Sequence, residues 1–246
     1  MNEPSTLYHY TSLETLFAII NNINNDDPNN VYFTLRATHA SFLNDDTEGK
    51  LLPNVLHDLG VTDSSLLILQ SLQGYPFVCS LSELDDDLNM WRCYANDGKG
   101  VAIGLNYSEL KSILNDKLTK IEYASHDELK KRLISGGIKQ MLHAEDKLPL
   151  SRLLYEALSY KHPSFSAEKE WRIYKYFIEN GFRISNGQII PFLELHISVS
   201  AMETILLGPK CEFEKNRFSI YRMLKNKISS TDLNHIKIIK SNIPLT

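Results

Sequence analysis

The spacing of apolar and polar residues predicts short strands mixed with amphipathic helices. Runs rich in β-branched and aromatic residues predict strands over 7–10, 31–35, 77–81, 101–105, 120–123, 189–195, 204–207 and 236–239. Helical spacing predicts helices over 11–20, 51–72, 88–95, 127–143, 150–160 and 212–228. The segment 101–105 is apolar on both faces, so we expect it at the centre of a sheet.

The first helix shows the clearest start and the clearest buried face. Thr11 is predicted to begin it, with Glu14 three residues later in a capping-box arrangement. The face expected to be buried, at positions i, i+3, i+4 and i+7, consists of Leu13, Leu16, Phe17 and Ile20. Further along, the Asn186-Gly187 pair is a strong signal for a tight hairpin turn.

The order of these elements favours an α+β fold. Strands and helices occur in clusters rather than in strict alternation, which indicates mixed, mostly antiparallel sheets with flanking helices. No stretch has the composition of an interdomain linker, so residues 1–246 are predicted to form one domain with a helical insert at about 125–162.

Composition narrows the classes of function. A net charge of -4 argues against a general nucleic-acid binder, which usually carries a basic excess. No apolar run approaches the roughly 18 residues of a membrane span, so no membrane partner is expected. Three widely spaced cysteines without a Cys-x-x-Cys pair indicate a reduced, cytoplasmic protein. The acidic segment 44–49 lacks the closing Glu of a calcium loop, and no metal site is predicted.

Charged residues at the start of one predicted strand are the first candidates for chemistry. Alternation along a strand would place Glu168, Glu170 and Arg172 on one side and Trp171 and Ile173 on the other. A solvent-facing ladder with a Glu–Arg pair would explain them without any function. Two carboxylates converging with a guanidinium would be costly in a core strand, and the other motifs of the chain make the solvent-facing ladder less favoured.

Two other pieces carry side chains that a dinucleotide site needs. His9 lies between two tyrosines just before the first helix, although a lone histidine on a strand is more often structural. The segment 90–95 combines Trp91, Arg92 and Tyr94, which a short core-packing helix would also explain. Together with Glu168 and Glu170, these residues supply a ring to stack, a ribose contact, a cation for phosphate and a carboxylate.

The order of these motifs resembles a known family. The segments are LYHYT at 7–11, LND at 43–45 with Glu48, VCSLS at 78–82, MWRCYA at 90–95, KGVAIG at 99–104, EKEWR at 168–172 and ILLGP at 205–209. As a set they resemble the bacterial domain-of-unknown-function family numbered 2971, whose name implies no activity. The opening YHYT, the strand at 31–34 and the late Glu-x-Glu are more distantly similar to the ADP-ribosyltransferase superfamily, in particular its DarT-like, DNA-modifying toxins.

This second resemblance implies an NAD site. Glu170 would match the catalytic glutamate, and Glu168 the residue two before it that helps to set the acceptor. His9 would contact an NAD ribose, and Tyr32 or Tyr94 would stack on nicotinamide. The remaining residues of the implied cofactor site are Tyr10, Thr11, Asn44, Arg92 and Arg172, of which Asn44 and Arg92 have no assured counterpart in the superfamily.

The resemblance thus implies an NAD-dependent mono-ADP-ribosyltransferase acting on a protein or nucleic-acid acceptor, as a toxin or phage-defence effector with an antitoxin or regulatory partner. Two alternatives are an NAD glycohydrolase, with water as acceptor, and a non-catalytic nucleotide-sensing or interaction module. On the transferase hypothesis, Glu170→Gln is expected to abolish turnover while the fold survives.

Overall fold

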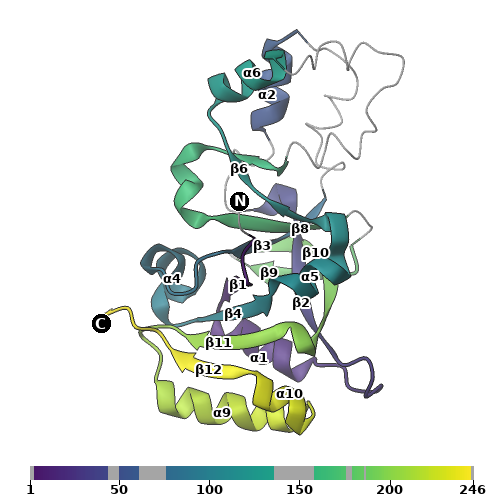
Figure 1. The fold of residues 1–246 in the computed structure, drawn as a ribbon, viewed down its shortest axis with the longest axis vertical. Coiled ribbons are helices and arrows are strands. Elements are labelled where there is room, and N and C mark those ends of the chain that lie inside the picture. Colours follow the sequence, from purple (N-terminus) through teal and green to yellow (C-terminus); the bar gives the residue numbers. More distant parts are fainter. Residues whose placement is uncertain are drawn as a thin grey trace. The chain divides into compact units, whose positions relative to one another are not determined.

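The computed structural model describes residues 3–43, 50–60, 76–135, 158–175, 179–185 and 187–244. Helices flank mostly antiparallel strands, which confirms the predicted α+β class (Figure 1). The chain divides into two compact units. Unit 1 comprises Met1–Arg36, Ser80–Leu118 and Glu194–Thr246, and unit 2 comprises Ala37–Cys79 and Thr119–Leu193. Each unit gathers separate stretches of sequence, and the single domain over 1–246 stays a prediction.

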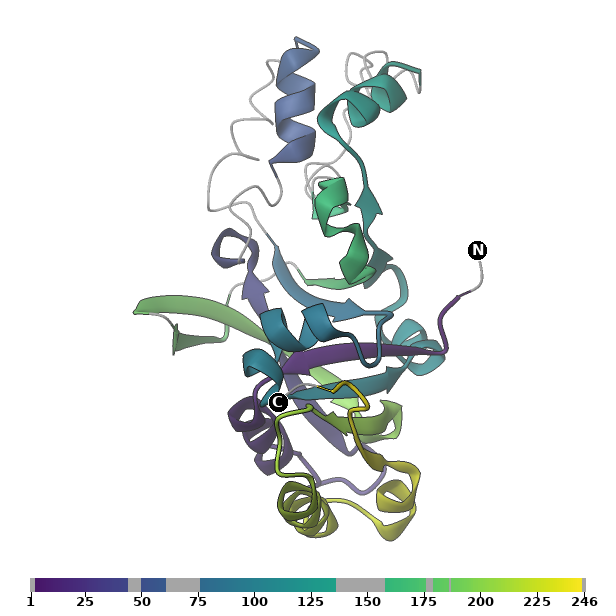
Figure 2. The same cartoon turned by 90° about the vertical axis from the view of Figure 1, so that its left-hand side faces the viewer.

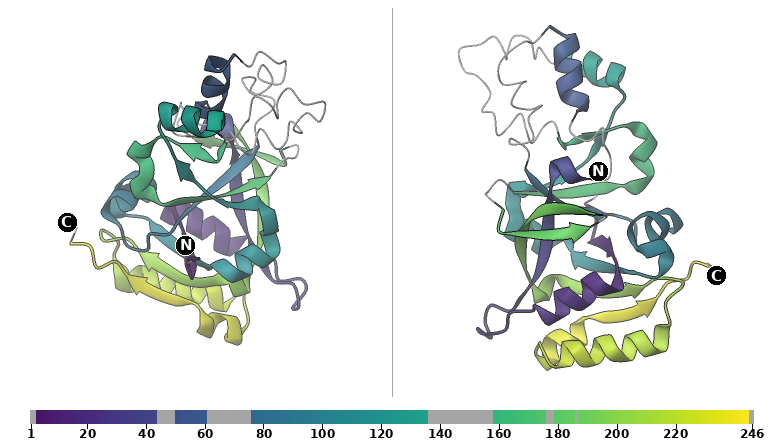
Figure 3. Two further views of the ribbon diagram at one scale, coloured as in Figure 1. Left: turned by 45° about the horizontal axis from the view of Figure 1, so that its top comes forward. Right: turned by 180° about the vertical axis from the view of Figure 1, so that it is seen from behind.

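Unit 1 is built on strands from the beginning, middle and end of the chain. Its elements are β1 (Thr6–Thr11), α1 (Leu13–Asn21), α4 (Leu88–Tyr94), β4 (Val101–Asn106), α5 (Tyr107–Leu114), β11 (Met202–Leu207), α9 (Phe213–Lys225), α10 (Ser230–His235) and β12 (Lys237–Lys240). β4 pairs antiparallel with both β1 and β11, and β12 adds parallel to β11. α9 contacts β12 and α10 (Figure 3).

The central position predicted for the apolar segment 101–105 is confirmed. β4 lies between two hydrogen-bonded neighbours, and Val101, Ala102, Ile103 and Leu105 are fully buried. A strand covered on both faces has no side for polar residues, which is why the segment is continuously apolar.

Unit 2 carries shorter elements. They are η1 (Ala40–Phe42), α2 (Leu51–Asp58), β5 (Leu118–Lys120, whose first residue belongs to unit 1), β6 (Glu122–Tyr123), α6 (His126–Ser135), β7 (Tyr160–Lys161), η5 (Pro163–Glu168), β8 (Glu170–Lys175) and β9 (Gly181–Ser185). β8 pairs with β3 and β5, β6 pairs parallel with β7, and β9 pairs antiparallel with β10. Besides β5, three strands have residues in both units: β2 (Tyr32–His39), β3 (Phe77–Ser82) and β10 (Gln188–Ser198).

The first helix differs from its prediction at its start and on its buried face. Ser12, not Thr11, is the N-cap, and its hydroxyl accepts a hydrogen bond from the Thr15 backbone N–H. Phe17 is 57% exposed, whereas Ile19 is buried. The residues Leu16, Ile19, Ile20 and Ile23 are buried at the same helical spacing, so the core-facing stripe begins three residues later than predicted.

Other predicted boundaries change for local reasons. Of the helix predicted over 51–72, α2 ends at Asp58 and Gly60 follows with a positive φ, as helix ends often require, while residues 61–72 lie outside the described part. The predicted helix over 150–160 does not reach its end, because Tyr160 belongs to β7. The sequence-based assignment missed α5, α10 and β9. Of the predicted insert, α6 is helical, while residues 136–157 lie outside the described part.

The carboxylate of Asp86 binds the segment that follows β12 within unit 1. Asp86 accepts hydrogen bonds from the Trp91 indole N–H (2.7 Å), the Ser241 hydroxyl (2.6 Å) and the Asn242 backbone N–H (2.7 Å). Trp91 is fully buried, so Asp86 satisfies a polar atom that the core would otherwise leave without a partner.

Candidate functional site

The two candidate carboxylates lie at a junction between a short helix and a strand. Pro163 begins η5 after His162, whose ring accepts a hydrogen bond from the Ser164 backbone N–H. η5 ends at Glu168, and Lys169 takes the left-handed conformation (φ 44°, ψ 51°) before β8 starts at Glu170. Glu168 therefore does not share a strand with Glu170. A non-glycine residue in this conformation carries backbone strain that its surroundings must offset.

Both carboxylates nevertheless converge on one lysine. The Lys161 Nζ lies 2.7 Å from Glu168 Oε2 and 3.1 Å from Glu170 Oε2. Arg172 donates two hydrogen bonds to Glu170, with Nε 2.7 Å from Oε1 and a terminal nitrogen 3.0 Å from Oε2. We call these four residues the charge cluster; it holds two negative and two positive side chains.

The charge cluster is buried apart from one of its members. The side chains of Lys161, Glu170 and Arg172 are 7%, 6% and 1% exposed, whereas that of Glu168 is 17% exposed. The solvent-facing ladder considered for the sequence is therefore wrong for Glu170 and Arg172. Buried charges persist only when they are paired and hydrogen-bonded, as they are here.

Electrostatics keep the lysine charged. Burial by itself lowers the pKa of Lys161, but attraction to Glu170 and Glu168 outweighs it and leaves this pKa well above its ordinary value. The ammonium also lies 4.6 Å from the centre of the Phe165 ring, an additional favourable contact for a cation. Lys161 is therefore a permanent cation at neutral pH and is unsuited to act as an amine nucleophile.

Two tyrosines complete the surroundings of the charge cluster. The Tyr123 hydroxyl accepts a hydrogen bond from the Glu170 backbone N–H, with 2.9 Å between oxygen and nitrogen. The Leu158 carbonyl accepts from Arg172 (2.9 Å) and from the Tyr174 hydroxyl (2.6 Å). Burial raises the pKa of Tyr123 and of Tyr174 to about 12, so both hydroxyls are protonated at neutral pH.

The other predicted cofactor residues from the first strand and helix belong to unit 1. His9 lies on β1 with Nδ1 3.1 Å from the Ser80 carbonyl oxygen, and burial lowers its pKa, so that the ring is neutral at pH 7. Tyr10 is buried, and its hydroxyl donates to the carbonyl oxygens of Leu84 and Asp85. Burial raises the pKa of Tyr10 above its ordinary range. Thr11 ends β1 opposite Val101.

The aromatic and basic candidates of unit 1 have varied surroundings. The Tyr32 ring stacks on His196 with centroids 4.4 Å apart, so it already has a planar neighbour. Tyr94 packs against the buried cluster around Trp91, which matches the core-packing interpretation of that segment. Arg92 is exposed on α4. Asn44 lies outside the described residues.

Sequence analysis did not identify Lys161, the lysine at the centre of the charge cluster. Lys161 is a single basic residue in β7, and only tertiary packing brings it against the carboxylates of η5 and β8. The expected absence of a metal site stays a prediction, although the described residues contain no group of three or more metal-ligating side chains. In the same part of the chain, no helix has the length and apolarity to cross a membrane.

Part of the chain matches a known family model. Residues 90–173 match the family model described as "Protein of unknown function (DUF2971)". This match begins in α4 at Met90 and ends in β8 at Ile173, so it includes the whole charge cluster. No curated protein and no solved structure matches the chain. The DUF2971 match supports the family resemblance over about a third of the sequence and assigns no activity.

Proposed function

We propose that this protein is an NAD-dependent ADP-ribosyltransferase with a protein or nucleic-acid acceptor, and that the pair Glu168 and Glu170 is its carboxylate centre. The supporting observation is the convergence of both carboxylates on Lys161, across a strained left-handed residue. Strained backbone tends to occur where a site needs side chains in one fixed arrangement. An ADP-ribosyltransferase-like fold is part of this proposal.

The proposed reaction breaks one bond and forms another at C1′ of the nicotinamide ribose. Transfer breaks the glycosidic bond between nicotinamide and C1′ of the ribose, and the bonding electrons leave with nicotinamide. An acceptor oxygen or nitrogen then bonds to C1′ and loses its proton to a carboxylate or to water. Developing positive charge on the ribose is stabilised by a fixed carboxylate, as in glycoside hydrolysis.

The greater exposure of Glu168 supports a substrate contact at this residue. Both oxygens of Glu170 bind cations, whereas Glu168 is the most exposed side chain of the charge cluster. In this proposal Glu168 meets the ribose, while Glu170 positions Lys161 and Arg172 beside it. The ribose contact that the resemblance implied for Glu170 is thereby assigned to Glu168, and Glu170 becomes a positioning residue.

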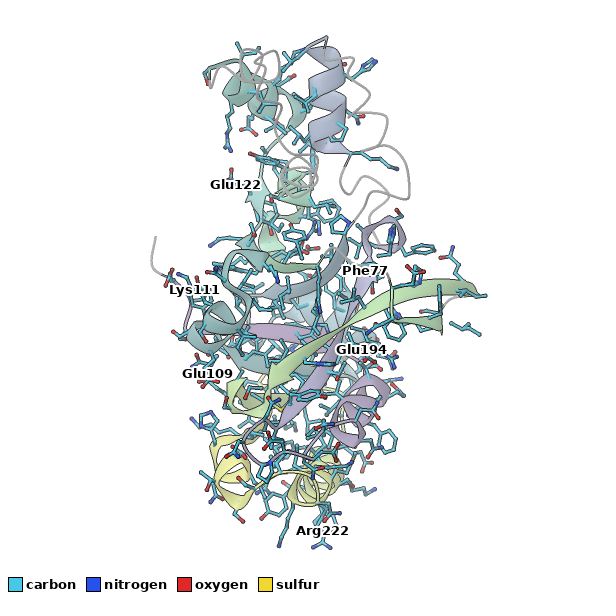
Figure 4. The ribbon with its side chains drawn as sticks, turned by 90° about the vertical axis from the view of Figure 1, so that its right-hand side faces the viewer. Phe77, Glu109, Lys111, Glu122, Glu194 and Arg222 are labelled. Atoms are coloured by element: carbon cyan, nitrogen blue, oxygen red, sulfur yellow. The ribbon has the colours of Figure 1, made fainter. Side chains whose placement is uncertain are left out.

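The test follows labelled NAD with the purified protein, alone and with DNA, RNA or cell lysate. The wild-type protein should release nicotinamide and label a macromolecule. Glu168→Gln should lower the rate about a hundred- to thousand-fold, the usual cost of losing one electrostatic stabiliser. Glu122→Gln is the matched control, because Glu122 is an exposed carboxylate of unit 2 that forms an ion pair with the exposed Arg132 (Figure 4). An unaltered rate in Glu168→Gln, or no release with any acceptor, would overturn the proposal.

One observation favours a second candidate. Because both oxygens of Glu170 bind cations, the charge cluster also suits a non-catalytic nucleotide-sensing module. Such a module would bind NAD in calorimetry without releasing nicotinamide. Release of nicotinamide without transfer of label would instead identify the glycohydrolase alternative.

A further inference from the structure

The hairpin of β9 and the first half of β10 has one apolar outer face. The strands pair antiparallel, with Ser185 opposite Gln188, Ile184 opposite Ile189 and Phe182 opposite Pro191. Gly187 has a positive φ (74°) in the turn, which agrees with the predicted tight hairpin. Alternation along each strand places Phe182, Ile184, Ile189 and Pro191 on the same face.

The two faces of this hairpin differ sharply in burial. Ile184 is 82% exposed, Ile189 68% and Phe182 62%, whereas Ile190 and Phe192 on the opposite face are buried. The Phe192 ring lies directly over Gly181, where a Cβ would come within 2.4 Å of it. The inner face is therefore already packed, and the outer face is not. Figures 2 and 4 show the hairpin (green) running out beyond the neighbouring ribbons of unit 2.

We propose that this outer face packs against the same face of a second copy of the chain, in a two-fold symmetric dimer. In such a dimer each hairpin covers the other, as two sheets do in a β-sandwich. The proposal concerns assembly and is independent of the proposed enzymatic function.

Charge is the first reason for choosing a second copy as the occupant. None of the four outer-face side chains is ionisable, so the face can meet itself without repulsion between like charges. The one charged residue of β9, Arg183, is opposite buried Ile190 and donates to Thr38, so β9 adds no charge to the outer face.

Area is the second reason. Phe182, Ile184 and Ile189 together expose on the order of 400 Å² of apolar side chain, given about 150–250 Å² for a whole large side chain. A standard interface buries roughly 800 Å² per partner, of which a little over half is apolar. The outer face thus supplies nearly all the apolar area that one side of a stable dimer needs.

The test measures the mass of the full chain in solution by sedimentation velocity over a range of concentrations. The wild-type protein should be a dimer, and Ile184→Lys should raise the dimer dissociation constant at least tenfold. Phe218→Lys is the matched control, since Phe218 is a large apolar residue of unit 1 with 68% exposure and should leave the dimer intact. Ile184 is so exposed that its replacement leaves folding unaffected, which circular dichroism verifies.

A charge-pairing experiment separates this dimer from other assemblies. Ile184→Glu alone should also be monomeric, and an equimolar mixture of Ile184→Glu with Ile184→Lys should associate again. Recovery is expected because a two-fold axis brings the same region of both copies together. A monomeric wild-type protein at every concentration, or a dimer unchanged by both substitutions, would overturn the proposal.

Discussion

Burying Glu170 and Arg172 together makes each charge dependent on the other. Arg172 donates two hydrogen bonds to Glu170 and a third to the Leu158 carbonyl, and it is 1% exposed. A guanidinium holding a carboxylate with two parallel bonds fixes the orientation of both groups. At the scale of single residues, the charge cluster therefore acts as one unit rather than as separate pairs.

A substitution at Glu170 is expected to affect stability as well as activity. Glu170→Gln leaves Arg172 and Lys161 short of one negative charge, and breaking a buried ion pair typically costs about 3–5 kcal/mol. Urea denaturation should show that loss, whereas Glu122→Gln should change the free energy of unfolding by less than about 1 kcal/mol. The fold of Glu170→Gln is thus still expected to survive, but with this loss of stability. A variant as stable as the wild type would contradict the buried pairing.

At the scale of elements, the turn from η5 into β8 positions the carboxylates. The sequence placed Glu168 and Glu170 together because strand residues two apart share a face. The structure brings them together differently, through a left-handed residue between a short helix and a strand. The convergence was thus predictable from sequence, but its geometry was not, because nothing in Lys169 itself signals a positive φ.

The strain at Lys169 can be measured. Lys169→Gly should stabilise the protein by up to about 1 kcal/mol, because glycine adopts a positive φ without the cost that a Cβ imposes. Lys169→Val should destabilise it by about 1–2 kcal/mol, because a branched side chain is least tolerant of this conformation. Thermal and urea unfolding of both variants provide the check. Equal stability of the two variants would show that the turn is unstrained.

The spacing of apolar residues predicted burial correctly for β4, but it could not predict contacts between residues of different elements. β4 is buried on both faces, and its continuous apolar run predicted this. Phe17 fits the helical spacing equally well but is exposed, since spacing cannot choose between overlapping stripes. Lys161 was missed because its partners, Glu168 and Glu170, belong to other elements, and the residues around Lys161 in the sequence do not indicate these contacts.

At the scale of the whole molecule, alkaline pH should weaken the fold. Burial raises the pKa of Tyr123 and Tyr174 to about 12, and the pKa of Tyr10 and of Lys161 is also raised. A group whose pKa is higher in the folded state contributes stability below its unfolded pKa and loses it as pH rises through the folded value. All four groups therefore act in the same direction.

Urea unfolding from pH 7 to pH 12 should show a steep loss of stability beginning near the ordinary tyrosine pKa of about 10. Tyr174→Phe should make the decline shallower, because one titrating group is gone. The same variant should lose about 1 kcal/mol at neutral pH, through the missing hydrogen bond to Leu158. Stability that is the same at pH 11 as at pH 8 would contradict the burial of these hydroxyls.

The way unit 1 is assembled has a consequence for biosynthesis. Its strands β1 and β4 are made before β11 and β12, before the α9 helix that contacts α1, and before the Asn242 backbone that binds Asp86. Domains commonly fold as their sequence emerges, N-terminal parts first. Here a nascent chain that stops before Glu194 would expose one edge of β4 and one side of α1, so unit 1 completes its folding only after translation has passed residue 242.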